Sequence, residues 1–458
     1  MLIGGGLKRL ISGLVIGLGV ASGEVHAAKT PNIVLIVADD LGYSDLGFQA
    51  GQEIPTPHID ALAAGGVRCS NGYVTGPYCS PTRAGLLTGR YQQRFGHEFN
   101  PSGPTSGLPT SEVTIADRLT KAGYATALIG KWHLGGAPKF HPLKRGFGEF
   151  YGFLGGAHPY QPGEGAPIFR GEEVVKETEY LTDAIGREAA AFLDRQASGE
   201  KPFFLEITFN AVHTPMQATA EREAKFASIS NPRRRAYAAM LSAMDDAVGR
   251  VMAKLREKGL EENTLVIFFS DNGGPTMGGT TINGSINTPL RGSKRTTLEG
   301  GVRVPFVWSW KGVLPAGKVY DKPLVQLDVL PTALALAGVE VSPDWKLDGV
   351  DVLPFLKGDR EGTPHEVLFW RLGEQTAIRR GDWKLVRYDR NVDARAGEPV
   401  TKGARAVVTE AKLYNLSEDI GETLDLSAQR PDLVKSLDAE WKAWSNTLAE
   451  PLWGPAGG

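Results

Sequence analysis

The sequence has little that would let the chain bind nucleic acid or cross a membrane. Its 50 Lys and Arg residues are balanced by 52 Asp and Glu residues, which leaves a formal net charge of -2. Because phosphate backbones are bound by a surplus of clustered positive charge, this balance argues against a nucleic-acid partner. Beyond the N-terminus no segment is apolar over the length that a bilayer requires. We therefore expect an anionic ligand to be recognised by a few local cations, not by a basic surface.

Cysteine is also scarce, because the 458 residues include only Cys69 and Cys79. An even number of cysteines in an oxidising compartment favours a disulfide, so a Cys69–Cys79 pair is one interpretation. The other is that Cys69, in an expected strand, is a small buried hydrophobe and that Cys79 has a chemical role. We favour the second, with a disulfide forming only if Cys79 escapes that role.

The N-terminus has the pattern of a signal peptide. Lys8 and Arg9 supply positive charge, residues 11–20 form a short apolar run, and a Val-His-Ala tripeptide ending at Ala27 offers a cleavage site. The apolar run is too short to be a comfortable membrane anchor. We expect residues 1–27 to be removed and the mature chain, with no membrane span, to be periplasmic or secreted.

Strand-like and helix-like runs alternate after the signal peptide, which predicts an α/β fold with a mostly parallel sheet. Thr56 and Pro57 are typical of the cap and first position of a helix, and Ser111 is the expected start of another. From residue 343 the composition changes to short strand-like pieces and a terminal helix. We expect a catalytic domain at 28–342 and a C-terminal subdomain at 343–458. The expected strands are 33–38, 125–129, 203–209, 264–269, 375–379 and 383–388, and further helices are expected at 232–258, 326–337 and 431–448.

Polar residues follow four of these strands. The first runs into Asp39 and Asp40, the second into Lys131-Trp132-His133, the third toward His213, and the fourth into Asp271 and Asn272. In open α/β sheets ligands bind outside the carboxyl ends of the strands. If the strands are parallel, these four polar sets meet at one edge and form the site.

The acidic members of this set predict a metal. Asp39, Asp40, Asp271 and Asn272 offer only oxygen ligands, which suit calcium or magnesium better than zinc. Without a cation the three carboxylates would repel one another. A single Asp-Asp pair after a strand would be interpreted as a helix cap, but the matching Asp-Asn pair favours a metal site.

Cys79 stands in a segment that predicts an anion-binding helix mouth. Ser80 followed by Pro81 is typical of a helix start, so Cys79 should lie beside free backbone N–H groups and the positive end of the helix dipole. Arg83 follows four residues later and should lie on the same face.

The motifs together resemble the formylglycine-dependent sulfatase family, including arylsulfatases, N-acetylgalactosamine-6-sulfatases and bacterial polysaccharide sulfatases. The Cys79-x-Pro81-x-Arg83 segment resembles the first signature of that family, and residues 123–135 resemble the second. The resemblance covers nearly the whole mature chain, from about Asn32 to residues 413–416. Further matches are residues 39–42, 213–215, 270–273, 290–294 and 299–305.

This resemblance implies an alkaline-phosphatase-like sandwich, with a large mostly parallel sheet flanked by helices and a smaller C-terminal α+β subdomain with a short antiparallel sheet. It also implies a calcium ion and a maturation enzyme that oxidises Cys79 to formylglycine, whose hydrated aldehyde attacks the sulfate ester. The implied calcium ligands are Asp39, Asp40, Asp271, Asn272 and the modified Cys79.

The same resemblance gives the other residues their roles. Arg83 supports the hydrated aldehyde, Lys131 and Lys294 contact sulfate oxygens, and His133 helps to eliminate sulfate. His213 faces the leaving oxygen and protonates it. Asp271 helps to deprotonate the nucleophile.

The substrate that this resemblance implies is a sulfated carbohydrate. Residues 90–100 resemble segments of bacterial sulfatases that act on sulfated polysaccharides, and residues 155–160 are expected at the mouth of the site. From these segments and the 290–294 motif, His97, His158 and Arg291 are expected to contact substrate, together with Lys131, His213 and Lys294.

Two alternatives stay open at this point. One is a phosphomonoester or phosphonate hydrolase of the related alkaline-phosphatase superfamily, although eight histidines are a thin supply of ligands for two zinc ions. The other is a glycan-binding pseudosulfatase, if Cys79 is not converted. One departure from the family pattern is Arg295, where relatives often have a small residue. It could contact either substrate or a surface carboxylate.

Overall fold

A ten-stranded sheet forms the centre of the molecule. The computed structural model describes residues 1–5, 29–393 and 407–454, so the expected signal peptide lies almost wholly outside the described residues. The strand order is β11-β2-β10-β9-β1-β8-β4-β5-β6-β7. The large, mostly parallel sheet expected from the sequence is confirmed, because β9, β1, β8, β4 and β5 run parallel. The strands of this sheet are β1 (Asn32–Ala38), β2 (Val67–Cys69), β4 (Ala125–Lys131), β5 (Glu149–Phe153), β6 (Ile168–Arg170), β7 (Glu173–Val175), β8 (Phe203–Thr208), β9 (Thr264–Ser270), β10 (Phe306–Ser309) and β11 (Lys318–Tyr320).

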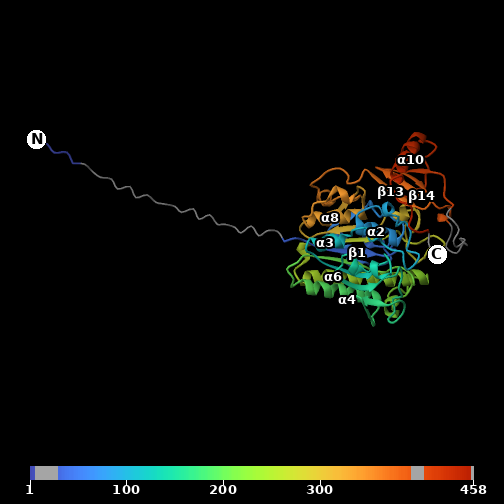
Figure 1. The fold of residues 1–458 in the computed structure, drawn as a ribbon, viewed down its shortest axis with the longest axis horizontal. Helices are drawn as coiled ribbons and strands as arrows, with labels where there is room; N and C mark the ends of the chain where they lie inside the picture. Colours follow the sequence, from blue (N-terminus) through green and yellow to red (C-terminus); the bar gives the residue numbers. More distant parts are fainter. Residues whose placement is uncertain (6–28, 394–406, 455–458) are drawn as a thin grey trace.

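Helices cover both faces of the sheet (Figure 1). On one face pack α1 (Pro57–Ala64), α4 (Leu181–Gln196) and α6 (Pro232–Glu257). The other face is covered by α2, α3 and α8. Among the described residues, none of the helices combines the length and the apolar character that a membrane crossing requires. The remaining helices are α2 (Cys79–Thr88), α3 (Ile115–Lys121), α5 (Ala220–Ala224), α7 (Glu299–Val302), α8 (Val329–Leu336), α9 (Leu353–Lys357) and α10 (Pro431–Ser445).

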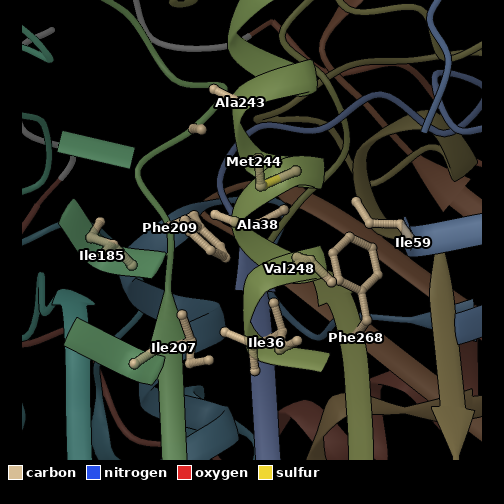
Figure 2. Packing of buried hydrophobic residues seen from close by; sticks show 14 of the residues in the cluster. Ile36, Ala38, Ile59, Ile185, Ile207, Phe209, Ala243, Met244, Val248 and Phe268 are labelled. Atoms are coloured by element: carbon tan, nitrogen blue, oxygen red, sulfur yellow. The ribbon is translucent and has the colours of Figure 1, made fainter. Parts of the chain in front are cut away.

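The central strand β1 is buried on both sides, as its unbroken apolar run predicts. Successive side chains of a strand point to opposite faces. Ile36 and Ala38 accordingly pack with Met244 and Val248 of α6 (Figure 2), whereas Leu35 belongs to the apolar cluster on the other face. Because β1 is packed on both faces, the position and direction of its carboxyl end, where Asp39 and Asp40 follow, are fixed.

The C-terminal part adds a second, antiparallel sheet. Its order is β13-β14-β15-β16, and α10 packs on β14 and β15 near the end of the chain (Figure 1). The expected short antiparallel sheet is therefore confirmed, and the boundary between residues 342 and 343 stays a prediction. These strands are β13 (Val367–Leu372), β14 (Gln375–Arg380), β15 (Trp383–Arg387) and β16 (Lys412–Asn415), and a separate parallel pair joins β3 (Gly72–Tyr73) to β12 (Leu324–Val325).

Three helix starts differ from the sequence expectation. The Thr56 side chain does not cap α1 but accepts a hydrogen bond from Gly47, and the carboxylate of Asp245 on α6 accepts the free N–H groups of α1 instead. The α3 helix begins after Thr114, whose side chain makes a capping box, and not at Ser111. The residues around Thr56 could not reveal how α1 is capped, because the capping carboxylate of Asp245 comes from a helix distant in the sequence.

The α2 helix begins at Cys79, so Ser80 is not its cap. The side chain of Ser80 bonds to residues outside the helix. Cys79 is therefore the first residue of the helix, two positions further in than the Ser80-Pro81 pattern predicts.

Glu206 is a buried carboxyl group in the middle of the sheet, away from the ion pairs at the sheet edge. Glu206 lies in the middle of β8, opposite Leu35 and Leu128 of the neighbouring strands, and is 2% exposed. Its Oε2 atom has no hydrogen-bond partner among the described residues. Burial raises the pKa of Glu206 to about 8, although the positive charge of Arg83 opposes the rise.

We predict that Glu206→Gln stabilises the protein at alkaline pH. The folded state holds the proton between the ordinary value of 4.5 and about 8, whereas the unfolded chain releases it. Wild-type stability therefore falls as pH rises through this window. The variant should be more stable by roughly 2–4 kcal/mol at pH 8 and nearly equal at pH 4.5. Urea unfolding at both pH values measures this, with the exposed Glu221→Gln as control. An unchanged pH dependence would contradict the prediction.

Candidate active site

The structure brings the four polar sets together at the carboxyl edge of the sheet. Asp39 and Asp40 follow β1, and Asp271 follows β9 in parallel register with it. The backbone links them directly, because Asp271 N–H donates to the Ala38 carbonyl and Asp40 N–H donates to Asp271 Oδ1 at 3.3 Å. The adjacency of parallel strands β9, β1, β8 and β4 thus produces the juxtaposition that the sequence predicts.

Each of the three aspartates faces its own buried cation. Lys131 Nζ lies 2.5 Å from Asp39 Oδ2, Lys294 Nζ lies 2.8 Å from Asp40 Oδ1, and Arg83 Nη2 lies 2.8 Å from Asp271 Oδ2. Their side chains are 3% exposed or less. Removing one partner of such a buried pair would leave an uncompensated charge, which typically costs 3–5 kcal/mol.

The carboxylates differ in their proton affinity. Burial raises the pKa of Asp39 to about 7 against the opposing charge of Lys131, and the neighbouring Asp271 and Asp40 add to the rise. Burial would also raise the pKa of Asp40, but Lys294 and His213 lower it to about 2. Asp39 therefore holds a proton more readily than Asp40 does, because at Asp39 the effect of burial outweighs the charge of Lys131.

The residues present fit a divalent cation. Ligand oxygens of Asp39, Asp40 and Asp271 lie within 4.8 Å of one another. Asp39 Oδ1 and the side-chain oxygen of Asn272 are buried and have no hydrogen-bond partner in the part of the chain that the structure describes. Buried polar atoms are normally satisfied, so these two oxygens indicate a missing ligand. An all-oxygen donor set suits a hard cation.

Cys79 lies beside this carboxylate cluster. Its sulfur is within 4.8 Å of a ligand atom of Asp39 and of His213. Burial raises the pKa of the Cys79 thiol to about 11, although Lys131 and Lys294 act in the other direction. The unmodified side chain is therefore a neutral thiol at pH 7 and a poor nucleophile. Cys69 and Cys79 are both free and buried, so the disulfide interpretation is wrong.

Two histidines complete the surroundings of Cys79. His133 has a left-handed backbone at φ 59°, and its buried Nδ1 has no hydrogen-bond partner among residues 1–5, 29–393 and 407–454. Burial and the nearby cations, Lys131 first among them, hold the pKa of His133 well below its usual range. Burial also lowers the pKa of His213 to about 4, although Asp40 opposes this. His213 Nδ1 faces the Thr214 carbonyl at 2.6 Å, so Nε2 points toward Asp40, 3.6 Å away.

His97 is placed behind the site. It is fully buried, and its Nε2 lies 2.7 Å from Ser80 Oγ, which donates to the carbonyl of His133 at 2.7 Å. Because the single hydroxyl hydrogen goes to that carbonyl, His97 Nε2 must carry the hydrogen that reaches Ser80. Burial lowers the pKa of His97 to about 3, so the ring is neutral. These hydrogen bonds hold the His133 backbone in its left-handed conformation. The His97 ring is fully buried behind Ser80, so the structure does not place it on a surface that substrate would reach.

His158 and Arg291 also have protein partners. The two ring nitrogens of His158 face the carbonyls of Pro159 and Ala166 at 2.6 and 2.7 Å. His158 lines a cavity of about 220 Å³ formed with residues 159–168 and 175–181. Arg291 stacks on Tyr388 and donates to the Glu422 carbonyl, so it faces the C-terminal part. Contacts of these two residues with substrate stay a prediction.

Several supporting residues were missed by sequence reasoning. Asn283 donates to the backbone carbonyls of Asp40 and Val212, and Thr281 Oγ1 donates to Asp40 Oδ2 at 3.2 Å. Tyr160 OH contacts the His213 carbonyl at 2.8 Å. Asn283 and Thr281 lie in a loop rich in Gly, Thr and Asn, whose composition predicts a loop but not which side chain turns inward.

Comparison with known proteins identifies the class of this site. The sulfatase family model matches residues 31–339. N-acetylgalactosamine-6-sulfatase from Sus scrofa is 32% identical over 92% of this chain and 85% of its own length. Arylsulfatase J from Mus musculus is 34% identical over 89% of this chain and 74% of its own. The chain therefore belongs to the sulfatase family.

Solved structures agree with this assignment. The structure of Ps i-CgsB in complex with k-i-k-neocarrahexaose is 38% identical, has a TM-score of 0.84 and covers 93% of this chain and 95% of that one. The PsFucS1 sulfatase from Pseudoalteromonas sp. is 29% identical with a TM-score of 0.77, covering 92% and 90%. A phosphonate monoester hydrolase of Agrobacterium radiobacter, at 19% identity and a TM-score of 0.64, shares the fold alone. The protein is a sulfuric ester hydrolase with an alkaline-phosphatase-like fold.

Proposed function

We propose that this sulfatase removes sulfate from a sulfated carbohydrate outside the cytoplasm, using a formylglycine made from Cys79 and a bound calcium ion. The observation that carries the proposal is the pair of unsatisfied buried oxygens, Asp39 Oδ1 and Asn272 Oδ1, beside the buried Cys79. They supply what a hard cation needs at the position where the reacting side chain stands.

Calcium would be held by Asp39, Asp40, Asp271, Asn272 and the modified residue 79. When bound, it would polarise a sulfate oxygen and stabilise the negative charge that develops during the reaction. Its positive charge would also lower the pKa of Asp39, which burial raises first and the neighbouring carboxylates raise further.

Conversion of Cys79 to formylglycine would replace a side chain that is a poor nucleophile at neutral pH. A buried thiol whose pKa is about 11 is protonated at neutral pH. The hydrate of formylglycine would supply one oxygen that attacks sulfur and displaces the sugar oxygen. The second hydroxyl would then lose its proton and re-form the aldehyde, which breaks the bond between carbon and the sulfated oxygen and releases sulfate. Arg83, anchored on Asp271 by two hydrogen bonds, lies one helical turn below it and would hold that hydrate in place.

The other residues bind charge and move protons. Lys131 and Lys294, already oriented by Asp39 and Asp40, are the cations that would contact sulfate oxygens. Fixed donors of this kind stabilise the transition state without reorganising. His213 presents Nε2 toward the site. The negative charge of a bound sulfate ester would raise the low pKa of His213, and the protonated ring would then give its Nε2 proton to the leaving oxygen. His133 would serve the elimination of sulfate from residue 79.

A sulfated sugar is the substrate class that the relatives support. The names of two of them refer to N-acetylgalactosamine 6-sulfate and to a bound neocarrahexaose. A protonated histidine also suits a sugar hydroxyl, which is a poor leaving group, better than it suits a phenol. A panel of marine galactan saccharides, glycosaminoglycan saccharides and aryl sulfates tests this class. Turnover of small aryl sulfates with none on any glycan would overturn it.

The mass of one tryptic peptide tests the nucleophile. Residues 69–83 form a peptide that contains both cysteines. We predict that protein from the native host shows an aldehyde at residue 79, so that the peptide takes up one alkyl group, at Cys69, instead of two. Expression without a maturation enzyme provides the control with two alkylated cysteines. Two alkyl groups on the native protein would contradict the proposal and favour a glycan-binding pseudosulfatase.

Calcium should stabilise the fold through the same residues. At 100 times its dissociation constant, calcium adds about 2.7 kcal/mol to the free energy of unfolding, which raises Tm by a few degrees. We predict that Asn272→Ala loses most of this increase and that the exposed Asn391→Ala keeps it. Thermal unfolding after EDTA treatment, with and without added calcium, measures the effect. Equal shifts in both variants would place the ion elsewhere.

Leaving-group dependence tests the role of His213. Replacing it by alanine should lower kcat on a sugar sulfate by about 10²–10⁴-fold, because the alkoxide needs a proton to leave. On 4-nitrophenyl sulfate the loss should be much smaller, since nitrophenolate is a stable anion. The exposed His58→Ala is the control. An equal loss on both substrates would show that His213 acts on binding or structure and not as an acid.

A further inference from the structure

Arg295 differs from the other cations around Cys79. Lys131, Lys294 and Arg83 are each paired with an aspartate and buried. In the described part of the chain no carboxylate pairs with Arg295, whose one side-chain hydrogen bond is a 3.4 Å contact with the Gly279 carbonyl. The side chain is partly exposed to solvent.

The position of Arg295 is fixed by the nucleophile segment itself. Its N–H donates to the Pro77 carbonyl at 2.7 Å, and its guanidinium lies 5.8 Å from the centre of the Tyr78 ring. Lys294 Nζ lies 5.6 Å from the same ring. Tyr78 directly precedes Cys79, so the ring next to the nucleophile position contacts both the buried Lys294 and the partly exposed Arg295.

The backbone of Arg295 is held in a conformation that arginine rarely adopts. Its φ angle is 72°, in the left-handed region that favours glycine. Gln375 of β14, which is buried, donates to the Arg295 carbonyl at 2.8 Å. Strain of this kind persists where the surrounding structure enforces it, and it concentrates at ligand-binding positions. Here it directs a charged side chain toward the rim of the site.

From this arrangement we infer that Arg295 is a specificity residue for a second anionic group on the substrate, a sulfate ester or a carboxylate on the sugar next to the scissile sulfate. The inference rests on the proposed function, because it assumes that the scissile sulfate occupies the site of Lys131 and Lys294. A planar guanidinium binds either anion with paired hydrogen bonds. A substrate with one sulfate and no other charge would leave Arg295 in water.

Kinetics on matched saccharides test the inference. The substrates are a monosulfated disaccharide, the same disaccharide with a second sulfate on the adjacent sugar, and its analogue with a uronic acid there. For Arg295→Ala we expect KM to rise about 10–100-fold on the two dianionic substrates, the range typical of a charge-assisted hydrogen bond. On the monosulfated substrate KM should rise less than threefold, and kcat should change little on any of the three.

Two further variants separate charge from backbone strain. Arg295→Gly relieves the left-handed conformation but removes the charge, so it should lose the dianionic preference as fully as alanine does. Arg295→Lys should keep part of it. Arg360, an exposed arginine that stacks on Phe355 and has no carboxylate partner within the described ranges, is the matched control, and Arg360→Ala should keep the wild-type preference. If only the sulfated or only the carboxylated substrate responds, that anion is the one recognised.

An equal rise of KM on all three saccharides, or no rise on any, would overturn the inference. The proposed function fails in a different way, because wild type would then cleave 4-nitrophenyl sulfate and none of the saccharides. In that case the inhibition of aryl-sulfate turnover by the disulfated and monosulfated saccharides still tests Arg295. Equal inhibition constants for wild type and Arg295→Ala would then exclude it.

Discussion

The structure depends on a cluster of buried charge at one edge of the sheet. Three aspartates and three cations are held out of water there. Asp39, Asp40, Asp271 and Lys131 stand at strand ends, Arg83 on α2 and Lys294 in a loop. Such a cluster is costly to bury, and it persists because both faces of β1 and its neighbours are fully packed. The strain at Asp40 and His133, both at positive φ, belongs to the same arrangement, since each aims a side chain that a relaxed backbone would direct elsewhere.

Sequence reasoning predicted the parts of this site that local pattern determines. The buried strand before Asp39, the Asp-Asn pair after β9 and the helix after Cys79 are each encoded within about ten residues, and parallel pairing then brings them together. The same reasoning failed where distant residues decide. Asp245 caps α1 from another helix. His97 is buried behind Ser80, and a sequence motif does not show which of its side chains tertiary packing will bury.

The contrast between Arg291 and Arg295 shows this limit within one motif. Both are polar residues of the segment that carries Lys294, and the sequence favours Arg291 as the substrate contact. In the structure Arg291 turns toward Tyr388 and Glu422, whereas Arg295 remains beside Tyr78. The two residues also differ in backbone conformation, since Arg295, unlike Arg291, has a positive φ angle. No propensity rule would assign that conformation to an arginine.

The C-terminal sheet is therefore part of the site and not an appendage to it. Lys384 of β15 is fully buried and bridges Glu299 and Glu422 at 2.8 and 3.0 Å. Glu299 begins the short helix that follows the Lys294–Arg295 segment, and Gln375 holds the Arg295 carbonyl. A substitution that broke the Lys384 bridge would leave buried carboxylates unpaired and loosen this segment from a distance. The Gln375 contact and the Lys384 bridge thus tie the C-terminal sheet to the loop in which the buried Lys294 and the partly exposed Arg295 are neighbours.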